Sequence, residues 1–269
     1  MAFQGLTVTL PVGQQGFSGA HNQSAMGPGH FSAMANVDLD GGDIVKDGGA
    51  TKLNSGALGG PDVVRAGVSW SPSPGEQHDV VMLGNGDVKK DTGAGTFGTT
   101  LVSGLGDNVE PPPYFFTGGG EDVGLARKLF LCSAAHQMQY VLGTANTMQA
   151  ITTPPADWAS AFPTCGVLHA GRIFAAGNAN DPHRVYYTTA SNHLVYTGAG
   201  TGTLAIYGGE GTGISGLLSF RGLLVVFKYP TGIYTVDTRD ASVANWSVAR
   251  VTLAVGAANA QCIVPIEND

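Results

Sequence analysis

The chain has few charged residues. Asp, Glu, Lys and Arg make up 12% of its 269 residues, which is about half the usual share. Its 13 Lys and Arg residues form no cluster and are outnumbered by 20 Asp and Glu residues, for a net charge of −7. Tight nucleic-acid binding, which depends on neutralising several phosphates, is therefore not expected. Because a soluble monomer usually carries more surface charge, either neighbouring subunits cover part of the surface or Ser, Thr and Asn make it polar.

Cysteines are also scarce, and the three that occur, Cys132, Cys165 and Cys262, are far apart. This spacing excludes a disulfide framework and is typical of thiols that pack as small core residues in a reducing compartment. No apolar run reaches the roughly 18 residues that a membrane span needs. The N-terminus lacks the basic and apolar regions of a signal peptide. We expect neither a membrane span nor secretion.

Glycine is abundant, with 41 residues, about twice the usual share, and this favours tight turns over long helices. Residues 166–174 (GVLHAGRIF) recur in similar form at residues 216–224 (GLLSFRGLL), and each copy indicates two strands joined by a turn. Two weaker copies lie upstream. The corresponding apolar runs begin, at intervals of 49, 44 and 50 residues, at Val80, Leu129, Ile173 and Leu223.

Strand-rich repeats of about 40–50 residues are typical of β-propeller blades. We therefore predict an all-β fold, a β-propeller-like repeat of antiparallel sheets with an extended N-terminal arm; a β-sandwich is the alternative. Residues 1–60 are expected to form the arm and a hairpin, and residues 61–269 the propeller-like domain. Either four to five units close a small ring, with the hairpin supplying a strand, or the domain is incomplete at its C-terminus.

The pattern places four units and the segments between them. Asn85-Gly86 predicts a hairpin turn in the first unit, because both residues accept a positive φ. The second unit contains helix-forming residues, but its alignment with the other units favours strands. Residues 106–124 are predicted to be a loop, and residues 249–269 to begin a further unit. The four units are expected at residues 61–105, 125–152, 164–200 and 201–247.

The patterns that resemble metal sites are incomplete, and we predict no catalytic, cofactor-binding or metal-binding residue. A calcium loop would need an acidic residue at its twelfth position, which is absent after Asp38, Asp40 and Asp43. Two Cys–His pairs with a spacing of four would suit zinc on a helix. On a strand such residues lie roughly 13 Å apart, so we expect buried thiols and hydrogen-bonded histidines. These pairs are Cys132 with His136 and Cys165 with His169.

Two further patterns have simpler structural explanations. Residues 208–213 (GGEGTG) resemble a phosphate-binding loop, but the segment lacks the Lys and is followed by a predicted hairpin instead of a helix. Six tyrosines are candidates for a sugar-binding surface, although tyrosines in strands more often pack half-buried. These are Tyr186, Tyr187, Tyr196, Tyr207, Tyr229 and Tyr234.

The stretch of residues 35–54 (ANVDLDGGDIVKDGGATKLN) resembles the N-terminal region of tailed-phage virion proteins that contain a propeller. In that group a short Asn-containing strand is followed by a GG-x-I-x-K/R-x-GG hairpin and a K-L-N strand. Residues 222–236, Trp246-Ser247-Val248 and residues 257–262 are similar to later segments of the same group. The group includes tail nozzle, hub and DNA-stabilising proteins, which are commonly longer than this chain.

The resemblance implies a structural virion component of a bacteriophage tail, as a nozzle, hub or collar that helps to retain or conduct the genome. Its partners would be other virion proteins and further copies of itself, without a cofactor or specific nucleic-acid binding. It would be assembled in the cytoplasm of the host bacterium and located in the virion. The alternatives are a propeller that binds a glycan or receptor on the virion and, less favoured, an enzyme that processes glycosides.

The polar N-terminal arm is the best candidate to join one subunit to the next, because such a segment cannot fold alone. Deleting residues 1–30 is expected to impair assembly more than folding of the monomer. Sedimentation of the truncated protein, with circular dichroism of its monomer, measures both effects. An intact oligomer after the deletion would contradict a joining role for the arm.

Overall fold

The computed structural model describes residues 37–40, 43–46, 64–92, 96–106, 110–118, 127–143, 145–210 and 212–264, the first two ranges by their backbone alone. The chain divides into two units, Met1–Leu53 and Asn54–Asp269; the sequence predicted this boundary at residue 60. In the first unit, strands β1 (Val37–Asp40) and β2 (Asp43–Lys46) pair antiparallel as a hairpin.

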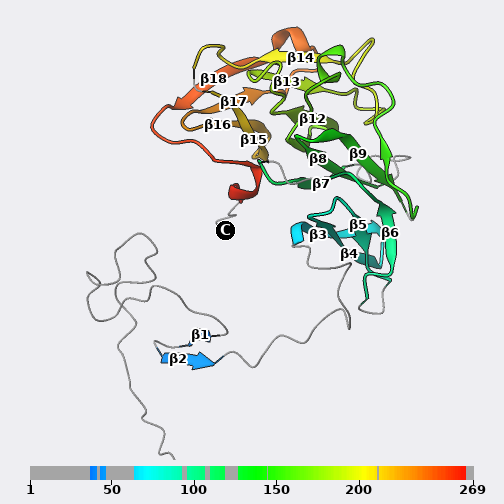
Figure 1. Cartoon of the computed structure of the whole chain (residues 1–269). Coiled ribbons are helices and arrows are strands. Elements are labelled where there is room, and N and C mark those ends of the chain that lie inside the picture. The colour runs from blue at the N-terminus through cyan, green and yellow to red at the C-terminus, as the bar shows by residue number, and fades with distance from the viewer. Residues whose placement is uncertain are drawn as a thin grey trace, which may run out of the picture. The chain divides into compact units, whose positions relative to one another are not determined.

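Four antiparallel sheets of four strands make up the described part of the second unit (Figure 1). Each sheet follows the chain from strand to neighbouring strand. The first sheet contains β3 (Val64–Ser73), β4 (Glu76–Leu83), β5 (Val88–Lys90) and β6 (Thr99–Val102). The second contains β7 (Tyr114–Gly118), β8 (Lys128–Ser133), β9 (His136–Leu142) and β10 (Gln149–Ala150).

The third and fourth sheets repeat this arrangement. The third contains β11 (Cys165–His169), β12 (Arg172–Ala176), β13 (Arg184–Tyr187) and β14 (Gly202–Ala205). The fourth contains β15 (Gly213–Phe220), β16 (Leu223–Tyr229), β17 (Ile233–Asp237) and β18 (Ser247–Thr252). Helical structure in the described residues is limited to short 3-10 turns, which include η2 (Ala156–Trp158), η3 (Val243–Asn245) and η4 (Ala260–Cys262).

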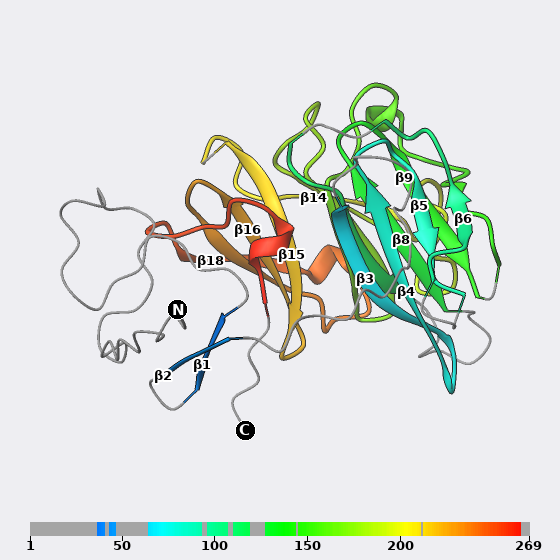
Figure 2. The ribbon, with the colours of Figure 1, turned by 60° about the horizontal axis from the view of Figure 1, so that its bottom comes forward.

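The first strands of the four sheets lie side by side. Strand β3 contacts β7, β7 contacts β11, and β11 contacts β15, so the sheets follow one another in chain order with their first strands innermost. Figure 2 shows the first and second sheets stacked face to face and the fourth sheet at the other end of the row. The predicted all-β, propeller-like fold is therefore confirmed. The four predicted run starts all lie on second strands, at Val80, Leu129, Ile173 and Leu223.

Three hydrophobic clusters fill the spaces between successive sheets. All six side chains of β8 are buried, because the second sheet has a neighbour on each face. Leu129 and Leu131 belong to the cluster shared with the first sheet, whereas Phe130 and Cys132 belong to the cluster shared with the third. A strand buried on both faces is mostly apolar, and the described part of the predicted unit 125–152 contains three strands, β8, β9 and β10, as predicted, in spite of its helix-forming composition.

Two of the predicted segment boundaries are wrong. The predicted loop 106–124 contains β7, whose Phe115 and Phe116 point into two different clusters; a five-residue strand after three prolines has too little pattern to be recognised. Residues 249–269 do not begin a new unit, because β18 pairs with β17 and completes the fourth sheet. In β18 most side chains are exposed, so its sequence lacks the apolar alternation that would assign it to a sheet.

The predicted Asn85-Gly86 turn joins β4 to β5, and Gly86 has φ +84°. A Cβ atom at Gly86 would lie 1.9 Å from the Gly106 amide nitrogen, whereas one at Gly75, with φ +82°, would meet nothing within 4 Å. Substitutions at these two glycines therefore distinguish the free-energy cost of the left-handed backbone from the cost of a steric clash.

We expect Gly75→Val to cost about 1–2 kcal/mol of unfolding free energy, because the left-handed backbone strains any residue with a Cβ. Gly86→Val should cost at least about 2 kcal/mol more, since the loop at Gly106 must also move. Each kcal/mol corresponds to roughly 2–4 °C in Tm for a domain of this size. Thermal melts of both variants test this, and equal losses would show that the contact with residue 106 is unimportant.

Candidate functional site

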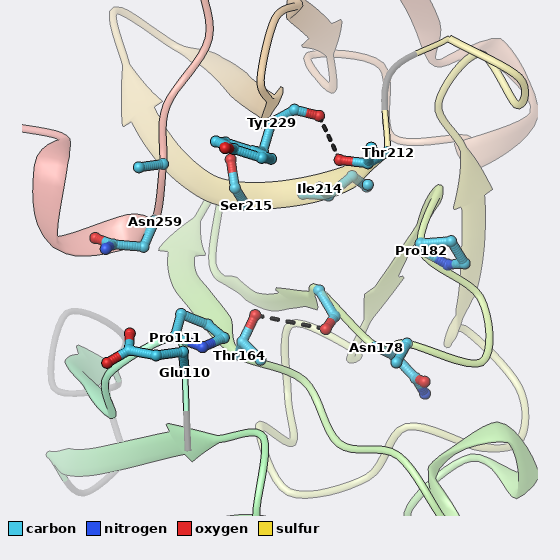
Figure 3. A pocket seen from close by; sticks show the side chains of 14 residues that line it. Glu110, Pro111, Thr164, Asn178, Pro182, Thr212, Ile214, Ser215, Tyr229 and Asn259 are labelled. Atoms are coloured by element: carbon cyan, nitrogen blue, oxygen red, sulfur yellow. Dashed lines mark hydrogen bonds between the residues drawn. The ribbon is translucent and has the colours of Figure 1, made fainter. Parts of the chain in front are cut away.

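A cavity of about 470 Å³ opens where β11 and β15 begin and where β12 and β16 end (Figure 3). Its walls come from the third and fourth sheets, from the segment that precedes β7, and from the segment that precedes η4. In Figure 3 the labelled side chains surround a central space. The lining residues are Glu110, Pro111, Thr164, Gly177, Asn178, Ala179, Pro182, Thr212, Gly213, Ile214, Ser215, Tyr229, Ala258 and Asn259.

Hydrogen bonds fix several of the residues that line the cavity. The Thr212 hydroxyl and amide both donate to the Tyr229 carbonyl, at 2.6 and 3.0 Å. The Ser215 hydroxyl donates to the Ala257 carbonyl at 2.7 Å and thereby joins β15 to the C-terminal segment. The Asn259 side-chain oxygen accepts from the Gln261 amide at 3.0 Å. Backbone and side chains fixed in this way give the cavity a defined shape.

The described lining of the cavity contains few charged groups. Glu110 is the single charged residue among the described lining residues; its side chain is 74% exposed, and the nearest charged atom of Arg65 lies 3.6 Å from its carboxylate. The remaining polar groups are amides and hydroxyls. The cavity is therefore suited to an uncharged polar ligand and unsuited to an anion, which would require a cation or a set of free N–H donors.

Two polar contacts join the third sheet to the fourth. One lies near this cavity, and the other lies at the opposite ends of the strands. The buried Lys228 ammonium donates to the carbonyls of Tyr207 and Glu210, at 2.8 and 2.9 Å, and lies 3.2 Å from His183 Nδ1. Desolvation lowers the pKa of Lys228. The sequence analysis missed this lysine, although period-2 alternation in the apolar run of β16 places it on the inward face.

The second contact centres on His169, which is 3% exposed. Its Nδ1 lies 2.8 Å from the Ser219 hydroxyl, and its Nε2 lies 2.8 Å from the Thr238 hydroxyl. One strand end of the third sheet is thus hydrogen-bonded to β15 and to the residue that follows β17. Burial lowers the pKa of His169, which keeps the ring neutral in the folded protein.

A second candidate site is the outer face of the fourth sheet. Alternation along β15, β16 and β17 points every second side chain away from the core, and these outward side chains are half-buried and mostly apolar. The C-terminal segment covers one part of the face, because a Cβ at Gly216 would lie 2.1 Å from Ile263. The remaining outward apolar residues are Leu218, Phe220, Leu223, Val225, Phe227 and Ile233.

The outer face of the first sheet is different. The inward residues of β4 include the buried Val80 and Met82, so Val81 lies on the outer face, where its cross-strand partners are Gly67 and Lys89. Most neighbours on this face are polar or charged: Ser69, Gln77, Asp79, Lys89 and Thr100. The two ends of the row of sheets therefore differ in chemistry.

The paired Cys and His candidates lie on strands: Cys165 and His169 on β11, and Cys132 and His136 on the neighbouring strands β8 and β9. Cys132 and Cys165 are fully buried, and burial raises the pKa of both thiols, that of Cys165 to about 12. His136 Nδ1 donates to the Gln137 carbonyl at 3.1 Å. Within the part of the chain that the structure describes, no three His, Cys, Asp or Glu residues are placed to hold a metal. The expected buried thiols and hydrogen-bonded histidines are confirmed.

The other sequence candidates have different outcomes. The side chains of Asp38, Asp40 and Asp43 lie outside the described residues. Residues 208–210 and 212–213 of the glycine-rich segment lie between β14 and the start of β15 and not at the start of a helix. Four of the six tyrosines are buried, whereas Tyr207 is 40% and Tyr229 is 52% exposed. Of these two, Tyr229 lines the cavity.

No family model matches the chain, and no curated protein matches it. Solved structures that match include two crystal structures of BBS1N in complex with ARL6DN, one soaked with lead and one with mercury. Their sequence identities to this chain are 12% and 14%, and their TM-scores are 0.40 and 0.43. The matches cover 68% and 74% of this chain but 52% and 56% of those chains. This chain therefore spans about half their length, and the likeness has no bearing on function.

Among the described residues, no helix has the length and apolar character to cross a membrane.

The two inter-sheet histidines predict acid sensitivity. Desolvation is the main cause that lowers the pKa of both His169 and His183 in the folded protein. In the unfolded chain these histidines have their ordinary pKa of about 6.5, so the unfolded chain binds protons at a higher pH than the folded protein does. These histidines should leave the free energy of unfolding unchanged above that pH. As the pH decreases below it, the free energy of unfolding should decrease.

Thermal melts at about pH 7.5 and about pH 5.5 measure the effect in a range above the ordinary carboxyl pKa values. In the His169→Gln variant the loss of Tm between the two pH values should be smaller than in the wild type, even if its Tm at the higher pH is lower. An unchanged loss would show that protonation of His169 does not contribute.

Proposed function

We propose that the protein is a structural component of a bacteriophage tail and that it acts by assembling with neighbouring subunits through its sheets. The observation that supports the proposed assembly is the apolar outer face of the fourth sheet. Inside the molecule, apolar sheet faces are covered by the next sheet of the row. The same kind of face at the end of the row supports a covering sheet from another subunit.

The partner that fits this face best is the same face of a second copy. A head-to-tail contact would place the apolar face against the outer face of the first sheet, where Asp79 and Lys89 would lose water. Two fourth sheets that pack face to face bury apolar side chains on both partners and close a two-fold dimer. Edge strand β18 and the residues after it have further exposed apolar side chains, with Val251 59%, Leu253 44% and Val255 55% exposed.

The tail assignment is supported by the resemblance of residues 35–54 and of the later segments to tailed-phage propeller proteins. The scarcity of charge, 12% of all residues, also favours a surface that is partly covered in an assembly. Detection of the protein in purified virions of the phage that encodes it, by quantitative mass spectrometry, tests the assignment. Absence from particles that contain the other tail proteins would contradict it.

Light scattering after size exclusion tests the interface. The wild type is expected as a dimer of 27.5 kDa chains, and Val225→Asp as a monomer, because each copy would bury a carboxylate in the interface. Val81→Asp is the matched control, since it places the same charge on the second strand of the first sheet and should remain a dimer.

Circular dichroism and Tm of both variants establish that they are folded. A monomeric wild type, or equal behaviour of the two variants, would overturn the interface. A mass that rises above the dimer with concentration would indicate a head-to-tail contact instead of the two-fold one.

A further inference from the structure

We propose that the cavity between the third and fourth sheets binds a neutral oligosaccharide, with Tyr229 as the platform for a sugar ring. This binding is a function beyond assembly. Tyr229 follows Phe227 on the outward side of β16, at the end of the outer face of the fourth sheet, whereas the other cavity-lining residues are not among those named for that face.

The size of the cavity fits a small ligand. Its volume of about 470 Å³ lies within the roughly 300–1,000 Å³ of known ligand pockets. Residues at strand ends of the third and fourth sheets form much of the wall, and the hydrogen bonds of Thr212 and Ser215 fix two of its sides. A site whose walls are already held in place loses little entropy when a ligand binds.

Tyr229 gives the cavity an apolar surface with a polar end. The residue is 52% exposed, unlike the four buried tyrosines. A tyrosine ring offers an apolar face and a hydroxyl that can donate and accept hydrogen bonds. A sugar ring has the matching chemistry, with C–H groups on its faces and hydroxyls around its edge.

Other lining residues offer polar groups that suit the hydroxyls of a sugar. Asn259 uses its side-chain oxygen within the protein, at 3.0 Å from the Gln261 amide, and this leaves its Nδ2 hydrogens to donate to a ligand. The exposed Glu110 carboxylate can accept from hydroxyls, and such charge-assisted hydrogen bonds are stronger than neutral ones. The Thr164 hydroxyl has only a long contact of 3.5 Å with the Gly177 carbonyl, so it too can serve a ligand.

The charge of the lining excludes other ligand classes. Phosphates, sulfates and acidic sugars need a cation or a nest of amides, and Glu110 is the one charged residue in the part of the lining that the structure describes. A proline-rich peptide needs a groove lined by several aromatic rings, but Tyr229 is the single aromatic side chain in that part of the lining. A neutral saccharide therefore fits the lining better than either of these ligands.

Saturation-transfer NMR and calorimetry with defined probes test the proposal. The neutral probes are chitotriose, maltotriose, cellotriose and mannotriose, and the comparison probes are sialyllactose and a proline-rich decapeptide. At least one neutral trisaccharide should bind at a concentration of about 10 mM or below, in the millimolar range usual for weak small-ligand binding. Tyr229→Ala should weaken that binding about tenfold or more, whereas Tyr229→Phe should stay within about threefold.

Leu142→Ala is the control variant, because it removes a 43% exposed side chain that does not line the cavity; its affinity should equal that of the wild type. Near-UV circular dichroism of each variant establishes that it is folded. The proposal is overturned if no neutral trisaccharide binds, or if Tyr229→Ala binds as tightly as the wild type. It is also overturned if sialyllactose or the peptide binds in place of the neutral sugars.

Discussion

Face-to-face burial of apolar sheet surfaces is the interaction on which the rest of this structure depends. Each sheet has four short strands and is too thin to exclude water by itself, so it is stabilised by the sheets beside it. The two middle sheets are covered on both faces, and β8 is buried along its whole length. Among the described residues, each end sheet has one face covered by another sheet, and the chemistry of its other face determines what that end of the row can contact.

The architecture was predictable because its signal is periodic. Apolar runs at Val80, Leu129, Ile173 and Leu223 mark the second strand of every four-stranded sheet, which has a hydrogen-bonded neighbour on each side. First and last strands were harder to predict. Strand β7 is short and follows prolines, and β18 lies at a sheet edge where solvent-exposed residues are tolerated, so neither has the alternation that identifies a strand.

The candidate site was predictable only in part. Tyr229 was one of six tyrosines in the sequence, and nothing in its local sequence distinguishes it from the buried Tyr186 or Tyr234. Its exposure follows from its place at the end of β16, and Glu110 and Asn259 come to the same cavity from segments far away in the chain. Such convergence is a property of the packed sheets and has no local sequence pattern. Lys228, by contrast, could have been recognised as a lone cation at an inward position of β16.

The inner strands form a row in which β3 contacts β7, β7 contacts β11 and β11 contacts β15. This arrangement also affects where local unfolding begins. In linear arrays each module is stabilised by its immediate neighbours, so local opening begins at the ends and spreads inward. Amide hydrogens of the second and third sheets should accordingly exchange most slowly with deuterium. Those of the first sheet should exchange sooner, and whatever covers the fourth sheet would slow exchange there alone.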